Sequence, residues 1–212
     1  ICSLFCADII VCLLDGSRLN SIFIMAKVRC DWCNNSEIYV KYHDEEWGNP
    51  VDEDSKLFEM LVLESIQAGL NWLTILKKRE NFRQAFNQFD VELISGYSED
   101  KISELLQDEG IIRHHGKIEA TIYNAKGFLK IQSEFGSFSN YIWSYVNHQP
   151  KLNSFSSLDQ VPSQTELSQK ISKDLKKRGF KFLGPTTVYA FMQATGVVND
   201  HLTYCFKHKK TP

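Results

Sequence analysis

The sequence predicts an all-α protein. No stretch of its 212 residues shows sustained alternation of apolar and polar side chains, which is the period of a half-buried strand. Apolar residues recur instead at helical spacing, as at Leu57, Leu61 and Ala68, and residues that favour helix N-termini precede several such runs. This length can bury a sizeable core, either in one domain or in two small domains that share a cleft.

The expected helices follow one another along the chain. Asp54 or Ser55 can cap the first, Asn71 the second, and Ser98 a short third one. The polar stretch 148–163 is the best candidate for a domain boundary, although a long connection between helical layers would have the same composition. The helices are expected at residues 55–72, 72–86, 99–107, 117–132, 140–147, 165–178 and 186–195.

Overall charge does not indicate a nucleic-acid-binding protein. The formal net charge is −2, with 43% hydrophobic and 12% aromatic residues, as in an ordinary globular protein. Two local basic patches stand out, at Lys173–Lys181 and Lys207–Lys210. Such runs are most often solvated helix faces, so a role in DNA binding needs further support.

The first 24 residues differ from the rest of the chain. They hold three of the six cysteines, lack a basic region before their apolar run, and are interrupted by Asp8. These features fit neither a membrane span nor a signal peptide. We interpret residues 1–24 as upstream sequence or a cloning remnant outside the fold, with Met25 as the natural start and 25–212 as a single helical domain.

The remaining cysteines are Cys30, Cys33 and Cys205. Three cysteines are too few for a disulfide framework, and they suit a reducing cytoplasm. No heptad repeat or obvious interface patch is present, so a monomer without membrane association is expected.

Both ends of this domain carry residues that bind metals. Cys30 and His43 lie near its start, and His201 and Cys205 stand four residues apart near its end. A set of two cysteines and two histidines is a closed tetrahedral zinc site, which would be structural and would clamp the chain ends together. Two alternatives remain: the residues are packing residues, or Cys33 replaces a ligand, because Cys30 and Cys33 have ligand spacing by themselves.

Glu64 stands out within the first expected helix, because it falls between Leu61 and Ala68 on their apolar stripe. Aromatic side chains gather in the sequence on either side of it, and aromatics can hold a flat, unstacked ring. The alternative is that the aromatics are core residues and that Glu64 caps or bridges helices. The aromatics concerned are Trp32, Tyr39, Tyr42, Trp47 and Trp72.

A helix-hairpin-helix outline spans Arg178–Asp200. A basic helix end leads into a short turn, Phe180–Gly184, and Pro185 then suits the first turn of another helix. The backbone amides of such a hairpin can bind a phosphate. Any pair of antiparallel helices can carry a glycine in its turn, and the turn Gly110–Gly116 is a second candidate for the same role.

With these motifs in place, the chain from Val28 to Cys205 resembles the 3-methyladenine DNA glycosylase I family, a branch of the helix-hairpin-helix DNA glycosylases. The resemblance covers nearly the whole chain after Met25, in order and with matching spacing. The segments that carry it are RCDW, YHDEEWG, LFEMLVLESIQAGLNWLTILKKRENFRQAF, GIIRHHGKI, WSYVNHQP and LKKRGFKFLGPTTVYAFMQATGVVNDH, followed by Cys205.

The resemblance implies one structural Zn²⁺ and a pocket for an extruded base. Glu64 would be the pocket carboxylate, with Tyr42 and Trp72 as its walls, because a methylated adenine in DNA carries a positive charge and an amino group. Behind these walls would lie a second tier of aromatics, Tyr39, Trp47 and Trp32. The zinc ligands would be Cys30, His43, His201 and Cys205.

The implied reaction is hydrolytic excision of 3-methyladenine from double-stranded alkylated DNA, which yields the free base and an abasic site. The position of the aspartate in related glycosylases falls near Asn199, beside Asp200, so no conventional catalytic aspartate is assigned. Lyase relatives carry a lysine just past the hairpin glycine, where this chain has Thr186. We therefore expect no lyase step.

DNA contacts are expected from the hairpin and from the turn after the Glu64 helix. Gln67 or Leu70 could fill the gap left in the base stack. With few cations available, weak binding to undamaged DNA and a shallow salt dependence are expected. The hairpin contacts would be Phe180, Lys181 and Gly184, with Lys176, Lys177 and Arg178 beside them.

Two rival functions remain. One is a zinc-clamped binding module that holds alkylated DNA without cutting it. The other is a zinc hydrolase, which four protein ligands disfavour because a catalytic zinc needs an open coordination position.

Overall fold

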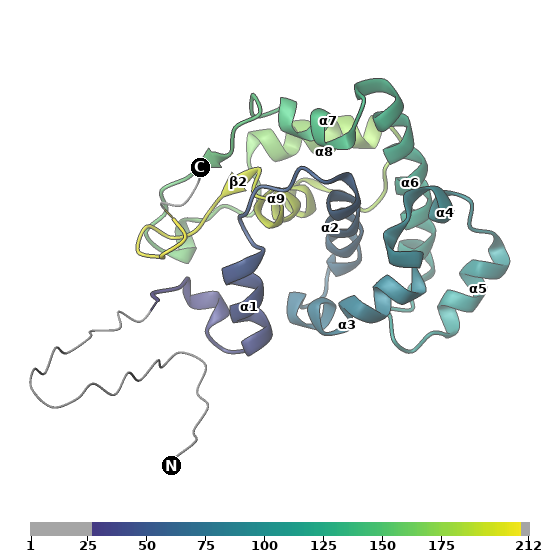
Figure 1. Ribbon diagram of the computed structural model, residues 1–212, viewed down its shortest axis with the longest axis horizontal. Coiled ribbons are helices and arrows are strands. Elements are labelled where there is room, and N and C mark those ends of the chain that lie inside the picture. The colour runs from purple at the N-terminus through teal and green to yellow at the C-terminus, as the bar shows by residue number, and fades with distance from the viewer. Residues whose placement is uncertain (1–26, 209–212) are drawn as a thin grey trace, which may run out of the picture.

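The computed structural model describes residues 27–208 (Figure 1). Within this range the chain forms α1 (Glu37–Glu45), α2 (Asp54–Gln67), α3 (Trp72–Ala85), α4 (Val91–Ser95), α5 (Glu99–Gln107), α6 (His115–Phe135), α7 (Phe138–Ser144), α8 (Glu166–Lys177) and α9 (Pro185–Ala194). Three single-turn 3-10 helices lie at Asp31–Cys33, Asn87–Phe89 and Leu158–Gln160. The interpretation of residues 1–24 as a separate segment falls outside the described residues.

The prediction of a helical fold is confirmed for the described chain. The sheet there consists of β1 (Lys151–Leu152) and β2 (Val198–Asn199), which pair in parallel. All predicted helices are present, α5 with the predicted bounds and the others with shifted ends, whereas α1 and α4 were not predicted. The first predicted helix ends early, at Gln67, because the chain turns at Gly69, whose φ is +82°.

Side-chain caps explain several helix starts. Asn71 accepts a hydrogen bond from the amide of Leu73, and Ser98 accepts one from the amide of Lys101. The predicted cap of α2 is wrong, because the cap position is Glu53 and Asp54 lies inside the helix. The Asp54 carboxylate instead accepts hydrogen bonds from two amides at the start of α7.

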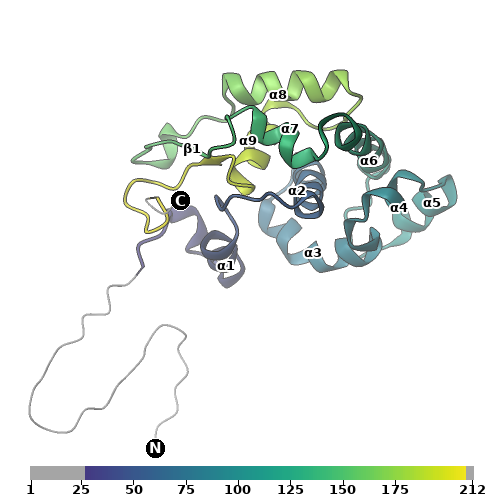
Figure 2. The same cartoon turned by 45° about the horizontal axis from the view of Figure 1, so that its top comes forward.

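Helix α2 is the centre of the fold. It contacts α3, α6, α7 and α9 (Figures 1 and 2), and every residue from Leu57 to Ile66 is buried. A helix buried on all sides needs no amphipathic pattern, and Glu59 and Glu64 are therefore both enclosed. Glu59 is neutralised by salt bridges with Arg79 and Arg83, whereas Glu64 has no such partner in the described chain.

The two ends of the described chain lie side by side (Figure 2). The amide of Phe206 donates to the carbonyl of Val28 at 2.9 Å, and the amide of Leu202 donates to the Cys30 sulfur at 3.4 Å. Cys30, Leu202 and Cys205 form a small apolar cluster apart from the main core. The chain ends are therefore joined through Cys30 and Cys205.

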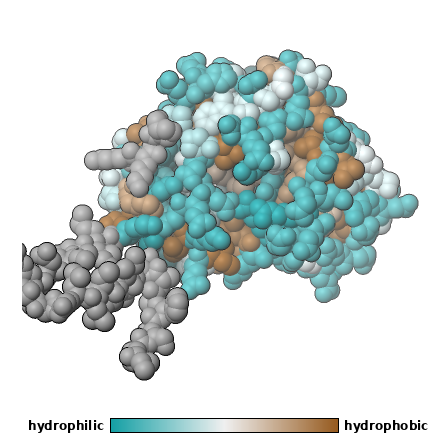
Figure 3. Space-filling model, in the orientation of Figure 1, coloured by the Kyte–Doolittle hydropathy of each residue, from teal (hydrophilic) through white to brown (hydrophobic). Residues whose placement is uncertain are grey.

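Hydrophilic residues cover most of the face drawn in Figure 3, with smaller hydrophobic patches between them. Within residues 27–208, no helix has the length and apolar character needed to cross a membrane. The cysteines in that range, Cys30, Cys33 and Cys205, are all free and buried. A cytoplasmic location remains a prediction.

Candidate active site and metal centre

A cavity of about 410 Å³ lies beside the buried face of α2. Its wall contains Glu64 and all five aromatics that the sequence singled out, so the structure brings these six residues together. Residues that were not predicted for the site, above all Gln193, complete the wall. The lining residues are Trp32, Tyr39, Tyr42, Trp47, Glu64, Gln67, Trp72, Leu158, Val161, Ala190, Gln193 and Asp200.

The aromatic rings of the cavity pack against one another, either tilted or edge to face. Tyr42 and Trp72 have ring centroids 5.6 Å apart at an interplanar angle of 56°. Trp32 meets Tyr39, Tyr42 and Trp47 edge-on, with centroid distances of 5.6, 6.4 and 5.1 Å. Rings that support one another in this way form rigid walls for a flat ligand.

Glu64 is the acidic group of the α2 wall, and its residue exposure is 5%. Burial raises the pKa of its carboxyl group to about 8, because removal from water disfavours the charged form. No hydrogen bond to this carboxyl group is present among the described residues. The indole Nε1 of Trp72 is also buried without a partner in the described chain. The Glu64 carboxyl group is therefore available to a ligand in the cavity.

The opposite wall of the cavity is formed by α9 and the segment after it. The Asp200 carboxylate accepts hydrogen bonds from the Tyr189 hydroxyl, from Nε2 of Gln193 at 2.8 Å and from Nδ2 of Asn153 at 2.6 Å. Asp200 is thus held by three donors and serves as an anchor for this wall. The sequence offered no signal for Gln193, because its partner lies across a turn and a strand.

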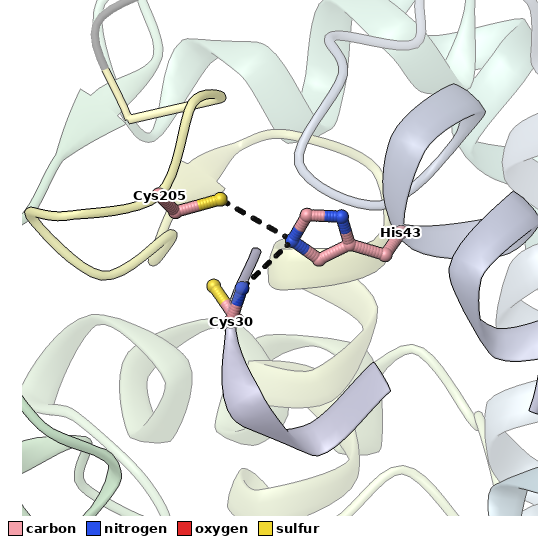
Figure 4. A group of neighbouring side chains, drawn as sticks. All are labelled: Cys30, His43 and Cys205. Atoms are coloured by element: carbon pink, nitrogen blue, oxygen red, sulfur yellow. Dashed lines mark hydrogen bonds between the residues drawn. The ribbon is translucent and has the colours of Figure 1, made fainter. Parts of the chain in front are cut away.

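The predicted metal ligands also converge. Donor atoms of Cys30, His43 and Cys205 all lie within 4.8 Å of one another, and all three residues are buried. Figure 4 shows both cysteines beside Nε2 of the His43 ring, where the Cys205 sulfur lies at 3.4 Å. Cys33 lies outside this group, and its thiol donates to the Cys30 carbonyl.

His201 adjoins this group, with its ring centroid 4.9 Å from that of His43. Its Nδ1 is 2.9 Å from the Asn199 side-chain oxygen, and its Nε2 is buried without a partner in the described chain. The His43 ring is oriented in the same manner by Asp44, whose carboxylate lies 2.8 Å from Nδ1. Both histidines therefore direct Nε2 away from their supporting oxygens, as metal-binding histidines do.

Gly48 makes room for this arrangement. A Cβ atom at Gly48 would lie 2.6 Å from Cε1 of His201, and its φ of +73° is a conformation that disfavours other residues. The glycine that ends the YHDEEWG segment is thus required by the packing of the His201 ring.

The pKa values of the two thiols, Cys30 and Cys205, are shifted in opposite directions. A hydrogen bond from Cys30 lowers the pKa of Cys205, and the same hydrogen bond raises the pKa of Cys30. One of the two sulfurs is thereby prepared as a thiolate, which is the form that binds a metal. The donor set and the unpartnered histidine nitrogen fit a tetrahedral zinc ion.

The helical hairpin joins α8 to α9, and its amides fall into two groups. The Phe180 amide donates to Leu175 O at 3.0 Å, and the Lys181 amide donates to the Asn124 side chain at 2.8 Å. The amides of Phe182, Leu183 and Gly184 have no hydrogen-bond partner among the described residues. Of the amides predicted to bind phosphate at Phe180–Gly184, those of Phe180 and Lys181 are thus already occupied, and those of residues 182–184 are left for a ligand.

The predicted cationic contacts at the hairpin also differ from one another. Lys177 and Lys181 are exposed, and no salt bridge in the described chain occupies them. Arg178 is bound by Asp174 at 2.9 Å and by Glu134 at 2.6 Å, so its guanidinium group stabilises the fold. The structure thus disfavours Arg178 and Phe180 as DNA contacts, because neighbouring groups already occupy their donors.

The turn after α2 is also held by hydrogen bonds. Gln67 donates through Nε2 to Leu70 O at 2.6 Å, and the Leu70 side chain is 37% exposed. Lys117, at the start of α6, donates to Ile66 O at 2.7 Å and to Ala68 O at 2.6 Å. The second candidate turn, 110–116, approaches the hairpin, since the His114 and Phe182 rings are 6.1 Å apart.

Comparison with known proteins gives the class to which this fold and site belong. Residues 32–208 match the family model described as methyladenine glycosylase, and the chain belongs to that family. The prediction of a glycosylase enzyme is therefore confirmed.

Individual relatives show how similar this chain is to known glycosylases. The DNA-3-methyladenine glycosylase 1 of Escherichia coli K12 is 49% identical over 84% of this chain and 95% of its own length. A DNA-3-methyladenine glycosylase of Haemophilus influenzae is 50% identical over 84% and 96%. A crystal structure of a 3-methyladenine DNA glycosylase I has a TM-score of 0.83 at 51% identity, covering 85% of this chain and all of that one. The enzyme from Staphylococcus aureus, studied for its recognition of 3-methyladenine, has a TM-score of 0.84 at 40% identity over 87% and 98%.

Proposed function

We propose that the protein binds double-stranded alkylated DNA as a monomer in the cytoplasm, flips out 3-methyladenine and hydrolyses its N-glycosidic bond. The observation that carries this proposal is Glu64, a buried carboxyl group without a hydrogen-bond partner in the described chain, set in a cavity of aromatic rings. The size of the cavity, about 410 Å³, suits a single base.

Charge explains the preference for a methylated adenine. In DNA, methylation at N3 gives the base a positive charge, and this charge would lower the pKa of Glu64 from about 8 and favour its ionised form. The faces of Tyr42 and Trp72 would also attract the cation. Neutral adenine would leave Glu64 protonated and gain neither interaction.

Two of the related solved structures carry substitutions at residues of these two types. One carries a tyrosine-to-phenylalanine substitution and is in complex with 3-methyladenine, and the other carries a glutamate-to-glutamine substitution. The substituted tyrosine and glutamate are separated by the same number of residues as Tyr42 and Glu64 are in this chain.

The chemical step requires little from the protein beyond binding. The methylated base already carries the charge that makes it a good leaving group, so the C1′–N9 bond breaks with its electron pair going to the base. Water then gives its hydroxyl group to C1′ and releases a proton. Asp200 already accepts three hydrogen bonds, and Thr186 stands where lyase enzymes have a lysine. We therefore propose a monofunctional enzyme that stabilises the departing base.

DNA would be held by two turns that both contact α6: the hairpin between α8 and α9, and the turn that follows α2. The amides of Phe182–Gly184 lie at the start of α9, where the helix dipole favours a phosphate, and the exposed Lys181 adds a cation. Gln67 or Leu70, in the turn beside the cavity, would fill the space that the extruded base leaves. This is a helix-hairpin-helix mode of binding, in which the backbone is gripped near the base pocket.

We also propose that Cys30, His43, His201 and Cys205 hold one Zn²⁺. Four protein ligands leave no open position, so the ion would have a structural role in joining the two chain ends. The partnerless Nε2 of His201 and the position of the Cys205 sulfur support this assignment.

The experiment that tests the function is base release from methylated duplex DNA by the full chain. We expect 3-methyladenine to be released, 7-methylguanine to stay in place, and the DNA strand to remain intact until the abasic site is cleaved by alkali. Strand breaks without alkali would contradict the monofunctional proposal. Tight binding of methylated DNA without any base release would establish the rival binding module instead.

A further inference from the structure

Gln193 is a polar residue of the cavity that the proposed mechanism does not use. It lies on α9, and its side chain lines the same cavity as Glu64. Its Nε2 donates to Oδ2 of Asp200 at 2.8 Å. Its Oε1 has no partner among the described residues, so the side chain offers a hydrogen-bond acceptor to whatever enters the cavity.

The orientation of the Gln193 amide is fixed by its surroundings. Asp200 also accepts from the Tyr189 hydroxyl and from Asn153, and these bonds hold its carboxylate in place. If the amide of Gln193 were rotated by half a turn, Oε1 would face this carboxylate and Nε2 would lose its acceptor. Leaving such a group unpaired is unfavourable, so the orientation with Nε2 towards Asp200 is retained. The bond to Asp200 therefore fixes which end of the amide is the acceptor, and Oε1 is the atom of Gln193 left to accept a hydrogen bond in the cavity.

The Glu64 carboxyl group is not fixed in this way. No hydrogen bond in the described chain holds it, whereas Asp200 holds the Gln193 amide. A fixed acceptor is selective, because it pairs with an amino group and repels a carbonyl oxygen.

We propose that Gln193 selects methylated adenine over methylated guanine by accepting a hydrogen bond from the exocyclic amino group at position 6 of the base, with Asp200 as the residue that positions it. Guanine carries a carbonyl oxygen at this position, which would face Oε1 without a proton between them. A site built for a hydrogen-bond donor rejects an analogue that lacks it far more strongly than an apolar pocket does. This inference rests on the proposed function and adds the residue that sets its base preference.

The test measures single-turnover release of 3-methyladenine and 3-methylguanine from methylated duplex DNA. Gln193→Leu removes the acceptor and keeps the approximate size of the side chain. Gln132→Leu is the matched control, because Gln132 also donates to an aspartate, Asp54, at 2.8 Å but does not line the cavity. Gln193→Met is a second variant, with a flexible side chain that fits if leucine disturbs folding.

We expect Gln193→Leu and Gln193→Met to lower the ratio of the two release rates at least about tenfold, mainly through slower release of 3-methyladenine. Gln132→Leu should keep the wild-type ratio even if its thermal stability falls. An unchanged ratio in both Gln193 variants, with 3-methyladenine still released, would overturn this inference alone. An equal loss of selectivity in Gln132→Leu would also overturn it, because the effect would then be structural. Failure of the wild-type protein to release either base would overturn the proposed function as well.

Discussion

Asn124 and Lys181 exchange two hydrogen bonds, which fix the hairpin to α6. The Asn124 side chain donates to the Lys181 carbonyl at 3.1 Å and accepts from the Lys181 amide at 2.8 Å. Two turns earlier on the same helix, Lys117 binds the carbonyls at the end of α2. Helix α6 thus connects the hairpin with the turn beside the base cavity, and it sets the distance between the two surfaces proposed to contact DNA.

Replacement of Asn124 by alanine tests this connection. The part-buried amide and carbonyl of Lys181 would lose their two hydrogen bonds, so we expect a stability loss of about 1–3 kcal/mol in urea unfolding. Because the hairpin amides would no longer be held in place, affinity for duplex DNA should also fall, as measured by fluorescence anisotropy. The control is Asn140→Ala, at an exposed asparagine of α7. Equal DNA affinity of Asn124→Ala and the wild type would contradict this role of α6.

The proposed zinc site gives a second prediction. The purified wild type should contain about one zinc per chain by atomic absorption, and Cys205→Ser should contain almost none. Loss of the ion should lower the Tm substantially, because the metal joins the two chain ends. Cys33→Ser is the matched control, since Cys33 is equally buried but lies outside the ligand group. Retention of zinc by Cys205→Ser, or its loss from Cys33→Ser, would show that the ligands are assigned wrongly.

The buried carboxyl group predicts how stability depends on pH. The pKa of Glu64 is about 8 in the folded protein and 4.5 when exposed, so the folded state binds more protons between these values. Its contribution is therefore complete below pH 4.5 and is lost as the pH rises towards 8. The free energy of unfolding should fall by up to about 1.4 kcal/mol per pH unit from this group.

Glu64→Gln removes this titration and provides the comparison. Urea unfolding at pH 5, 6, 7 and 8 should show the variant gaining stability relative to the wild type at each step. Parallel pH profiles for the two proteins would mean that Glu64 does not titrate in this range.

The hairpin cations give a prediction about salt. Lys181→Ala should weaken binding to undamaged duplex DNA and reduce the slope of log affinity against log salt concentration by about 1, because one phosphate contact is lost. Arg178→Ala should leave that slope unchanged and lower the Tm, since Arg178 is bound by Glu134 and Asp174. A reduced slope for Arg178→Ala with no change in Tm would reverse these assignments.

The sequence predicted the residues whose patterns are local. Glu64 stood out because a carboxylate interrupts an apolar stripe, and His201 and Cys205 because they share a ligand spacing. The helices were found from periodicity, although α4, with five residues, is too short to show one. These features depend on neighbours in the chain, and the sequence therefore contains their signal.

Features that depend on distant partners could not be predicted. Asp54 has the residue type and position expected of a cap for α2. Its carboxylate instead caps α7, more than eighty residues later in the chain. Gln193 and Asn124 are ordinary polar residues until Asp200 and Lys181 are brought beside them. Likewise, Arg178 belongs to a basic run in the sequence, but Glu134 occupies it in the fold. Tertiary contacts decide which donors and acceptors remain available for a ligand.

The most direct test of the whole account is the single-turnover rate of 3-methyladenine release by the wild type and by Glu64→Gln. Glutamine keeps the size of the side chain and a hydrogen-bonding oxygen but cannot carry the negative charge. Glu92→Gln is the control, because Glu92 is an exposed carboxylate on α4. We predict that Glu64→Gln slows release at least about 100-fold while Glu92→Gln has no effect. A Glu64→Gln variant that binds methylated DNA and releases the base at the wild-type rate would contradict the account.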